Sequence, residues 1–194
     1  LKYDASEWQL RELSCGSDVL TISGDVKKEK SVLLKALKKR RNRTFKKVRF
    51  YGTNDFDFIA KVLQIVKTKE LIFNRLMCVW SDEAVDALCN MLTTSNCVEK
   101  LSFSRCEMSL RELSTSQSEK LKCALQQCIS LKLLQIWSNT SCEHLLPEEN
   151  CEFDIRLNFS GSDKSFPFRS DIFSTALSNV EQTAFLKDFD PMTS

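Results

Sequence analysis

Short segments in which apolar and polar residues alternate recur along the chain, each followed by a segment with apolar residues three or four positions apart. Alternation places every second side chain on one face of a strand, whereas the wider spacing gives a helix one apolar face. Residues 69–103 are the clearest example, with a strand over 69–74, a helix over 81–94 and a second strand over 98–103. A single unit of about thirty residues cannot bury its own core, so neighbouring units must stack.

The strand pattern occurs six times, and the second inward residues of successive strands are 28, 23, 30, 33 and 21 positions apart. Strands that alternate with helices at this step require crossover connections and a parallel sheet. A doubly wound sheet also satisfies the pattern, but the regular step and the similar strand cores favour a solenoid. The inward pairs are Leu20 and Ile22, Val48 and Phe50, Leu71 and Phe73, Leu101 and Phe103, Leu134 and Ile136, and Ile155 and Leu157.

The helices between these strands are predicted at 27–41, 55–66, 81–94 and 116–129. Ser116 and Glu119 have the spacing of a capping box at the start of the last of them.

A stack of repeats exposes an apolar face at each end unless a cap covers it. A short amphipathic helix over 2–13 and a longer one over 170–188, after a turn-rich break over 161–169, are predicted to serve as these caps. The predicted organisation is one domain, and its start at Leu1 leaves open whether it belongs to a longer protein. Its parts are an N-terminal cap over 1–16, repeats over 17–160 and a C-terminal capping helix over 161–194.

The strand cores resemble leucine-rich repeats of the helix-containing, ribonuclease-inhibitor-like kind, whose strand consensus is Leu-x-x-Leu-x-Leu-x-x-Asn/Cys. Two units match all four marked places when Val, Ile and Phe are allowed. A third, at 45–53, matches three places and has Thr53 at the last, and the other units are degenerate. The resemblance covers roughly 19–159 and implies an α/β solenoid with parallel strands, outer helices and about six irregular repeats. The full matches are Val98, Leu101, Phe103 and Cys106, and Leu131, Leu134, Ile136 and Asn139.

In this family partners usually bind the concave, strand-lined face, so the resemblance implies a protein-interaction module that acts as an adaptor, a scaffold or a substrate-recognition domain. Tyr, Trp and Arg are enriched at interaction hot spots, and Ile72 would be an exposed apolar anchor. The alternative is structural: Tyr51 and Trp137 would pack under the loop after the fifth strand or against a cap. The expected partner-binding residues are Arg49, Tyr51, Ile72, Asn74, Gln135, Trp137 and Arg156.

Charge is unevenly distributed along the chain. Residues 27–49 hold twelve Lys or Arg and one acid, whereas residues 143–194 hold ten acids and four bases. Such a basic segment can bind nucleic acid or another polyanion, which is the alternative function; it is also typical of a solvated helix whose last turn favours cations. The polyanion-binding candidates are Lys38, Lys39, Arg40, Arg41, Arg43, Lys46 and Lys47.

Catalysis and cofactor binding have little support. His144 is the single histidine, and its spacing from Cys142 and Cys151 is not a standard zinc pattern. There is no Gly-rich phosphate loop, so we expect no enzyme activity, no metal and no cofactor. The nine cysteines contain no Cys-x-x-Cys pair and, as free thiols, favour an intracellular location, cytoplasmic or nuclear. No apolar run reaches the length of a membrane span, so we expect no membrane partner.

Overall fold

The structure is a computed structural model that describes residues 17–23, 30–106, 110–137, 145–146, 153–158 and 166–168. The helices predicted over 2–13 and 170–188 lie outside these residues. The strands are β1 (Val19–Ser23), β2 (Thr44–Tyr51), β3 (Lys67–Asn74), β4 (Lys100–Ser104), β5 (Leu133–Trp137), β6 (Asp154–Asn158) and β7 (Phe166–Phe168). The helices are α2 (Lys30–Lys39), α3 (Phe56–Leu63), α4 (Asp82–Thr94) and α6 (Thr115–Gln127).

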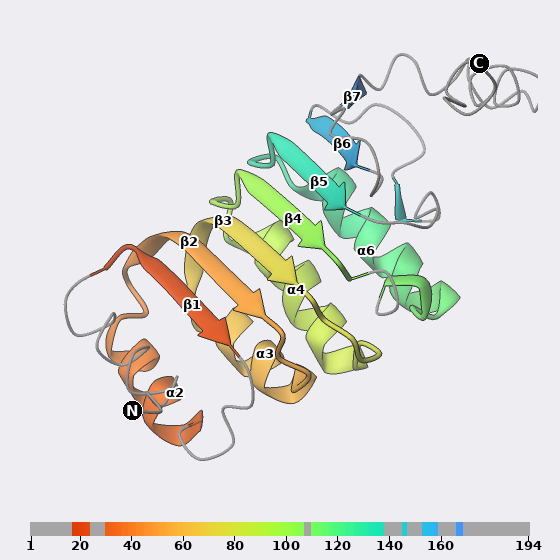
Figure 1. The fold of residues 1–194 in the computed structure, drawn as a ribbon. Helices are drawn as coiled ribbons and strands as arrows, with labels where there is room; N and C mark the ends of the chain where they lie inside the picture. Colours follow the sequence, from red (N-terminus) through yellow and green to blue (C-terminus); the bar gives the residue numbers. More distant parts are fainter. Residues whose placement is uncertain are drawn as a thin grey trace, which may run out of the picture.

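The strands form one sheet in sequence order, β1 to β7 (Figure 1). Strands β1 to β6 are parallel, and β7 is antiparallel to β6. The four helices lie together on one face of this sheet, each beside the strands that it connects (Figure 1). The prediction of an α/β protein with a parallel sheet and helices along one side is confirmed, and the arrangement is compatible with a solenoid.

The register of the parallel strands follows the predicted inward pairs. A register shift of one residue would turn every apolar side chain to the other face, so burial fixes the pairing strongly. Both inward residues of each strand are aligned with those of its neighbours from β1 to β6. The two aligned rows are Leu20, Val48, Leu71, Leu101, Leu134 and Ile155, and Ile22, Phe50, Phe73, Phe103, Ile136 and Leu157.

Aromatic side chains fill the centre of the core between the sheet and the helices. The ring of Phe73 is stacked between Phe50 and Phe103, with 5.3 Å between ring centroids on either side. Trp80, in the segment that leads into α4, meets Phe73 edge-on at 5.1 Å. Offset stacked and edge-to-face pairs are the favourable aromatic geometries, so this cluster joins three successive repeats.

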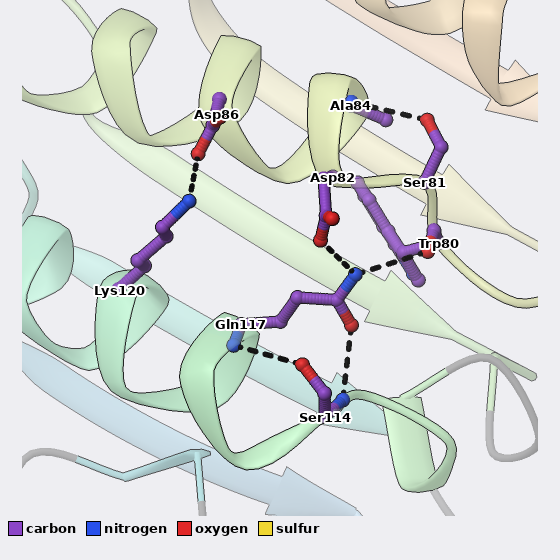
Figure 2. Close-up of polar contacts among 8 residues, drawn as sticks. All are labelled: Trp80, Ser81, Asp82, Ala84, Asp86, Ser114, Gln117 and Lys120. Atoms are coloured by element: carbon purple, nitrogen blue, oxygen red, sulfur yellow. Dashed lines mark hydrogen bonds and ion pairs between the residues drawn. The ribbon is translucent and has the colours of Figure 1, made fainter.

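Helix α6 begins with a capping box, although not at the predicted residues. Ser114, rather than Ser116, is the N-cap: its Oγ accepts from the N–H of Gln117, and the Gln117 side chain accepts from the N–H of Ser114. The Nε2 of Gln117 also donates to the carbonyl of Trp80 at 3.2 Å and to a carboxylate oxygen of Asp82 at 2.8 Å (Figure 2). The buried Gln117 side chain therefore joins the start of α6 to the start of α4.

The C-terminal end of the sheet differs from the predicted turn-rich break over 161–169. Within that break Phe166–Phe168 forms β7, with Pro167 opposite Arg156 of β6. Proline lacks an N–H to donate and is found in sheets mainly on edge strands, which is where β7 lies. A strand of three residues gives too short an alternation to be predicted from the sequence.

Candidate functional site

The face of the sheet opposite the helices, here called the open face, carries three rows of side chains that cross the parallel strands. The first row contains Lys47, Glu70 and Lys100, the second contains Arg49, Ile72, Ser102, Gln135 and Arg156, and the third contains Tyr51, Asn74, Ser104 and Trp137. All seven predicted partner-binding residues lie in the second and third rows. The shared register aligns these residues on four strands, β2, β3, β5 and β6, with Ser102 and Ser104 of β4 between them.

Side chains near the amino ends of the strands form bridged ion pairs. Glu70 contacts Lys47 at 3.0 Å and Lys100 at 3.1 Å, so one carboxylate joins three strands. Burial raises the pKa of Glu70, but hydrogen bonds and attraction from the two lysines outweigh it and hold this pKa below its ordinary value of 4.5. Glu99 is likewise held between two lysines. Each of these two carboxylates is therefore engaged within the protein.

Glu70→Gln should weaken the acid sensitivity of the fold. Because the folded-state pKa of Glu70 lies below its ordinary value, ionised Glu70 stabilises the protein above pH 4.5, and this stabilisation is lost as the pH falls through the lowered pKa. Urea unfolding between pH 7 and strongly acidic pH should show a steeper loss of stability in the parent than in the variant. The matched control is Glu119→Gln, because Glu119 is an exposed acid with one lysine partner. Equal acid sensitivity of parent and Glu70→Gln would contradict this assignment.

The two aromatic residues of the third row are solvent-exposed. Tyr51 is 37% exposed and Trp137 is 47% exposed. The caps and most of the loop after the fifth strand, on which the structural alternative depends, lie outside the described residues. Ile72 and Gln135 are half-buried in the second row. The predicted exposed anchor at Ile72 is therefore only partly accessible, and Tyr51 and Trp137 are the prominent apolar groups of this face.

Two arginines that were not among the predicted site residues lie beside this row. Arg75 and Arg105 follow directly after β3 and β4, and both are exposed. The guanidinium carbon of Arg75 lies 5.4 Å from the centre of the Tyr51 ring, in cation–π geometry. The sequence signal for both is positional: each lies two residues after the second inward residue of its strand, as Gly52 does in the preceding repeat.

The predicted polyanion-binding residues are spread over several environments. Lys38 and Lys39 end α2, and Arg40 and Arg41 follow in a turn. Arg43 pairs with Asp18, and Lys47 is engaged by Glu70 on the open face. The structure therefore does not bring the seven residues together as one free basic surface.

A shallow groove of about 800 Å³ lies at the amino ends of β3, β4 and β5. Its lining includes Glu99, which forms ion pairs with both Lys69 and Lys132 of the same lining, and the exposed Ile129. None of the seven predicted partner-binding residues lines it. The predicted site is thus an extended surface and does not coincide with this groove.

The cysteines give no metal centre in the part of the chain that the structure describes. No disulfide joins its six cysteines, and no group of three or more His, Cys, Asp or Glu side chains there could hold a metal ion. Burial, together with the nearby Asp86, raises the pKa of the Cys89 thiol to about 11, which disfavours its reactive thiolate. Cys142, His144 and Cys151 lie outside the described residues.

Comparison with known proteins adds no family assignment. No protein-family model, curated protein or solved structure matches this chain. Within the described ranges, no helix has the length and apolar character needed to cross a membrane. The candidate function therefore rests on the residues of the open face.

Proposed function

We propose that this chain is a protein-recognition domain of the leucine-rich-repeat type, which binds a protein partner on its open face as an adaptor, scaffold or substrate-recognition domain. The observation that carries the proposal is the exposure of Tyr51 and Trp137 in one row of a rigid parallel sheet. Large aromatic side chains with few rotatable bonds contribute strongly to binding at low entropic cost. Because the buried core fixes the register of the sheet, the backbone that carries Tyr51 and Trp137 is already ordered before a partner binds.

The repeat type is supported by the burial of one residue after each of β2, β3 and β4. Thr53, Leu76 and Cys106 are the third residues after the second inward positions, where the consensus has Asn or Cys, and all three are buried. The Sγ of Cys106 lies 3.5 Å from the carbonyl oxygen of Phe73 on the preceding strand. Of the three, only Cys106 makes such a bond to a neighbouring repeat: the buried Oγ1 of Thr53 has no hydrogen-bond partner, and Leu76 has no polar side-chain atom.

Removing both aromatic side chains should abolish partner binding. The double variant Tyr51→Ala/Trp137→Ala and the matched control Ile129→Ala, which removes an apolar side chain that is 81% exposed elsewhere, would be compared with the parent in quantitative affinity purification from lysate. Proteins retained by the parent and by Ile129→Ala should be lost from the double variant by about tenfold or more, as for a hot-spot residue. Circular dichroism checks that the double variant is folded.

Equal recovery of every protein by the parent and the double variant would contradict recognition by this face. A fall in recovery that also occurs with Ile129→Ala would indicate non-specific hydrophobic binding, and it would contradict open-face recognition equally.

The second candidate function is binding of nucleic acid or another polyanion through the basic segment. The observation in its favour is that Lys38, Lys39, Arg41 and Lys46 are exposed and make no ion pair with a described residue. Phosphate-driven binding weakens steeply with added salt. Replacing Lys38, Lys39, Arg40 and Arg41 by Ser would abolish such a complex and leave open-face recognition intact.

A further inference from the structure

Three successive repeats end their strands in the same left-handed backbone conformation, at Gly52, Arg75 and Arg105, with φ of 60°, 55° and 53°. The N–H of each donates to the carbonyl of the last residue of the next strand along the sheet. These bonds run from Gly52 to Asn74 at 2.9 Å, from Arg75 to Ser104 at 2.9 Å and from Arg105 to Trp137 at 3.2 Å. The three positions are therefore structurally equivalent.

Arginine is an unexpected residue for this conformation. Glycine adopts a left-handed φ without steric penalty, whereas in other L-residues the Cβ atom crowds the following carbonyl oxygen. Gly52, whose added Cβ would meet no atom within 4 Å, shows that the turn itself needs no side chain. Arg75 and Arg105 thus strain the backbone and add only their side chains. Residues held in this way are concentrated at functional sites.

The described charged residues of the second and third rows, which lie beside these two arginines, are all positive. Arg49 and Arg156 lie in the second row, and the described residues of the second and third rows contain no Asp or Glu. None of the four guanidinium groups forms an ion pair with a described residue. Nearer the amino ends of the strands, charges of both signs are paired with one another: Glu70 and Glu99 each form ion pairs with two lysines.

We propose, building on the open-face recognition described above, that the partner presents an acidic, extended peptide segment to Tyr51, Arg75, Arg105 and Trp137, here called the arginine patch. Guanidinium groups bind carboxylates through paired, charge-assisted hydrogen bonds. Arg75 and Arg105 bind the carboxylates, and the two aromatic side chains contact the residues on either side. Since the described residues of the second and third rows include no acid, they present no like charge to an anionic segment.

The dimensions of the arginine patch suit a short extended segment. Tyr51 and Trp137 occupy the same row on β2 and β5, three strand spacings apart, which corresponds to about 14 Å at about 4.8 Å per strand. An extended peptide covers this distance with about four residues. The segment would run across the strand ends, over the two arginines that lie between the aromatic residues.

A single-stranded nucleic acid is the other polyanion that arginine and aromatic residues bind, by base stacking and phosphate contacts. The Tyr51 ring already carries the Arg75 guanidinium over its face, so this ring is not free to stack a base on that side. Of the two aromatic residues, Trp137 is then the one with no guanidinium over its ring, and a patch with one such stacking surface beside two arginines favours a carboxylate ligand.

The test is a selection of random peptides of about eight residues, twice the length that spans the patch, displayed on phage and applied to the intact chain. The selected peptides should contain Asp and Glu in excess of the library. The best of them, made synthetically, should bind Arg75→Gly/Arg105→Gly about tenfold more weakly or worse by fluorescence polarisation. Because glycine suits both backbone positions, the melting temperature of this double variant should equal or exceed that of the parent.

The matched control is Lys39→Ser/Arg41→Gly, which removes two positive charges from exposed residues outside the patch and should bind the peptide as the parent does. Selected peptides without an acidic excess, whose binding is nonetheless lost in Tyr51→Ala/Trp137→Ala, would overturn the acidic partner and leave open-face recognition standing. Peptide binding that is unchanged in Arg75→Gly/Arg105→Gly and in Tyr51→Ala/Trp137→Ala would overturn both the acidic partner and open-face recognition. Oligouridylate is compared as a competitor with the unlabelled acidic peptide. If oligouridylate displaced the bound peptide at a lower concentration than the unlabelled peptide does, the proposal of a peptide partner would be overturned in favour of nucleic acid.

Discussion

Phe73→Ala should lower the free energy of unfolding by about 3–5 kcal/mol, the range for a buried aromatic residue truncated to alanine. Phe73 is fully buried and contacts Phe50 and Phe103 by stacking and Trp80 by its edge. Truncation of Phe73 removes apolar area from the core and leaves a cavity between neighbouring strands. The rigid rings of Phe50 and Phe103 cannot fill this cavity. Urea unfolding with linear extrapolation measures the change.

The matched control for Phe73→Ala is Ile72→Ala, on the same strand but directed to the open face. Ile72 is half-buried, so it should lose about 1 kcal/mol, because the truncated side chain was already partly in water. If the two variants lost equal stability, the aromatic stack would not be the centre of the core.

Gln117→Leu is expected to destabilise the protein by about 2–3 kcal/mol. The substitution keeps the size of the side chain but removes the acceptor for the N–H of Ser114 and the donor to the carbonyl of Trp80 and the carboxylate of Asp82 (Figure 2). Leaving a buried polar group without its partner costs about 1–3 kcal/mol. Because these bonds join α6 to the start of α4, amide hydrogen exchange should increase at both helix starts.

Gln127→Leu serves as the control for Gln117→Leu, since Gln127 is exposed near the other end of the same helix. A surface change of this kind should stay within about 0.5 kcal/mol of the parent. A similar small effect for Gln117→Leu would mean that water replaces the lost partners and that the link between the two helices adds little stability.

The strand positions and their register could be predicted from the sequence, because burial on one face demands a two-residue alternation that few other segments satisfy. The start of α6 could not be settled in the same way. Ser114 with Gln117 and Ser116 with Glu119 both have capping-box spacing. The choice depends on contacts of Gln117 with Trp80 and Asp82, more than thirty residues away in sequence.

The candidate site was only partly predictable. Tyr51 and Trp137 follow from their places in the alternating strands, and their alignment in one row follows from the register. Arg75 and Arg105 were missed because arginine is not a residue that indicates a left-handed turn. Only comparison with the equivalent Gly52 distinguishes them, and that comparison depends on knowing where each strand ends.

The identical alignment of successive strands also bears on how such a surface changes during evolution. Duplication of one strand–helix unit between β2 and β5 would insert a strand into the sheet and move Tyr51 and Trp137 apart by about 4.8 Å. The inward residues of the new unit would match those of its neighbours, because each repeat contacts mainly the adjacent ones. The length of peptide that fits between the two aromatic residues can therefore change by whole repeats while the core is conserved.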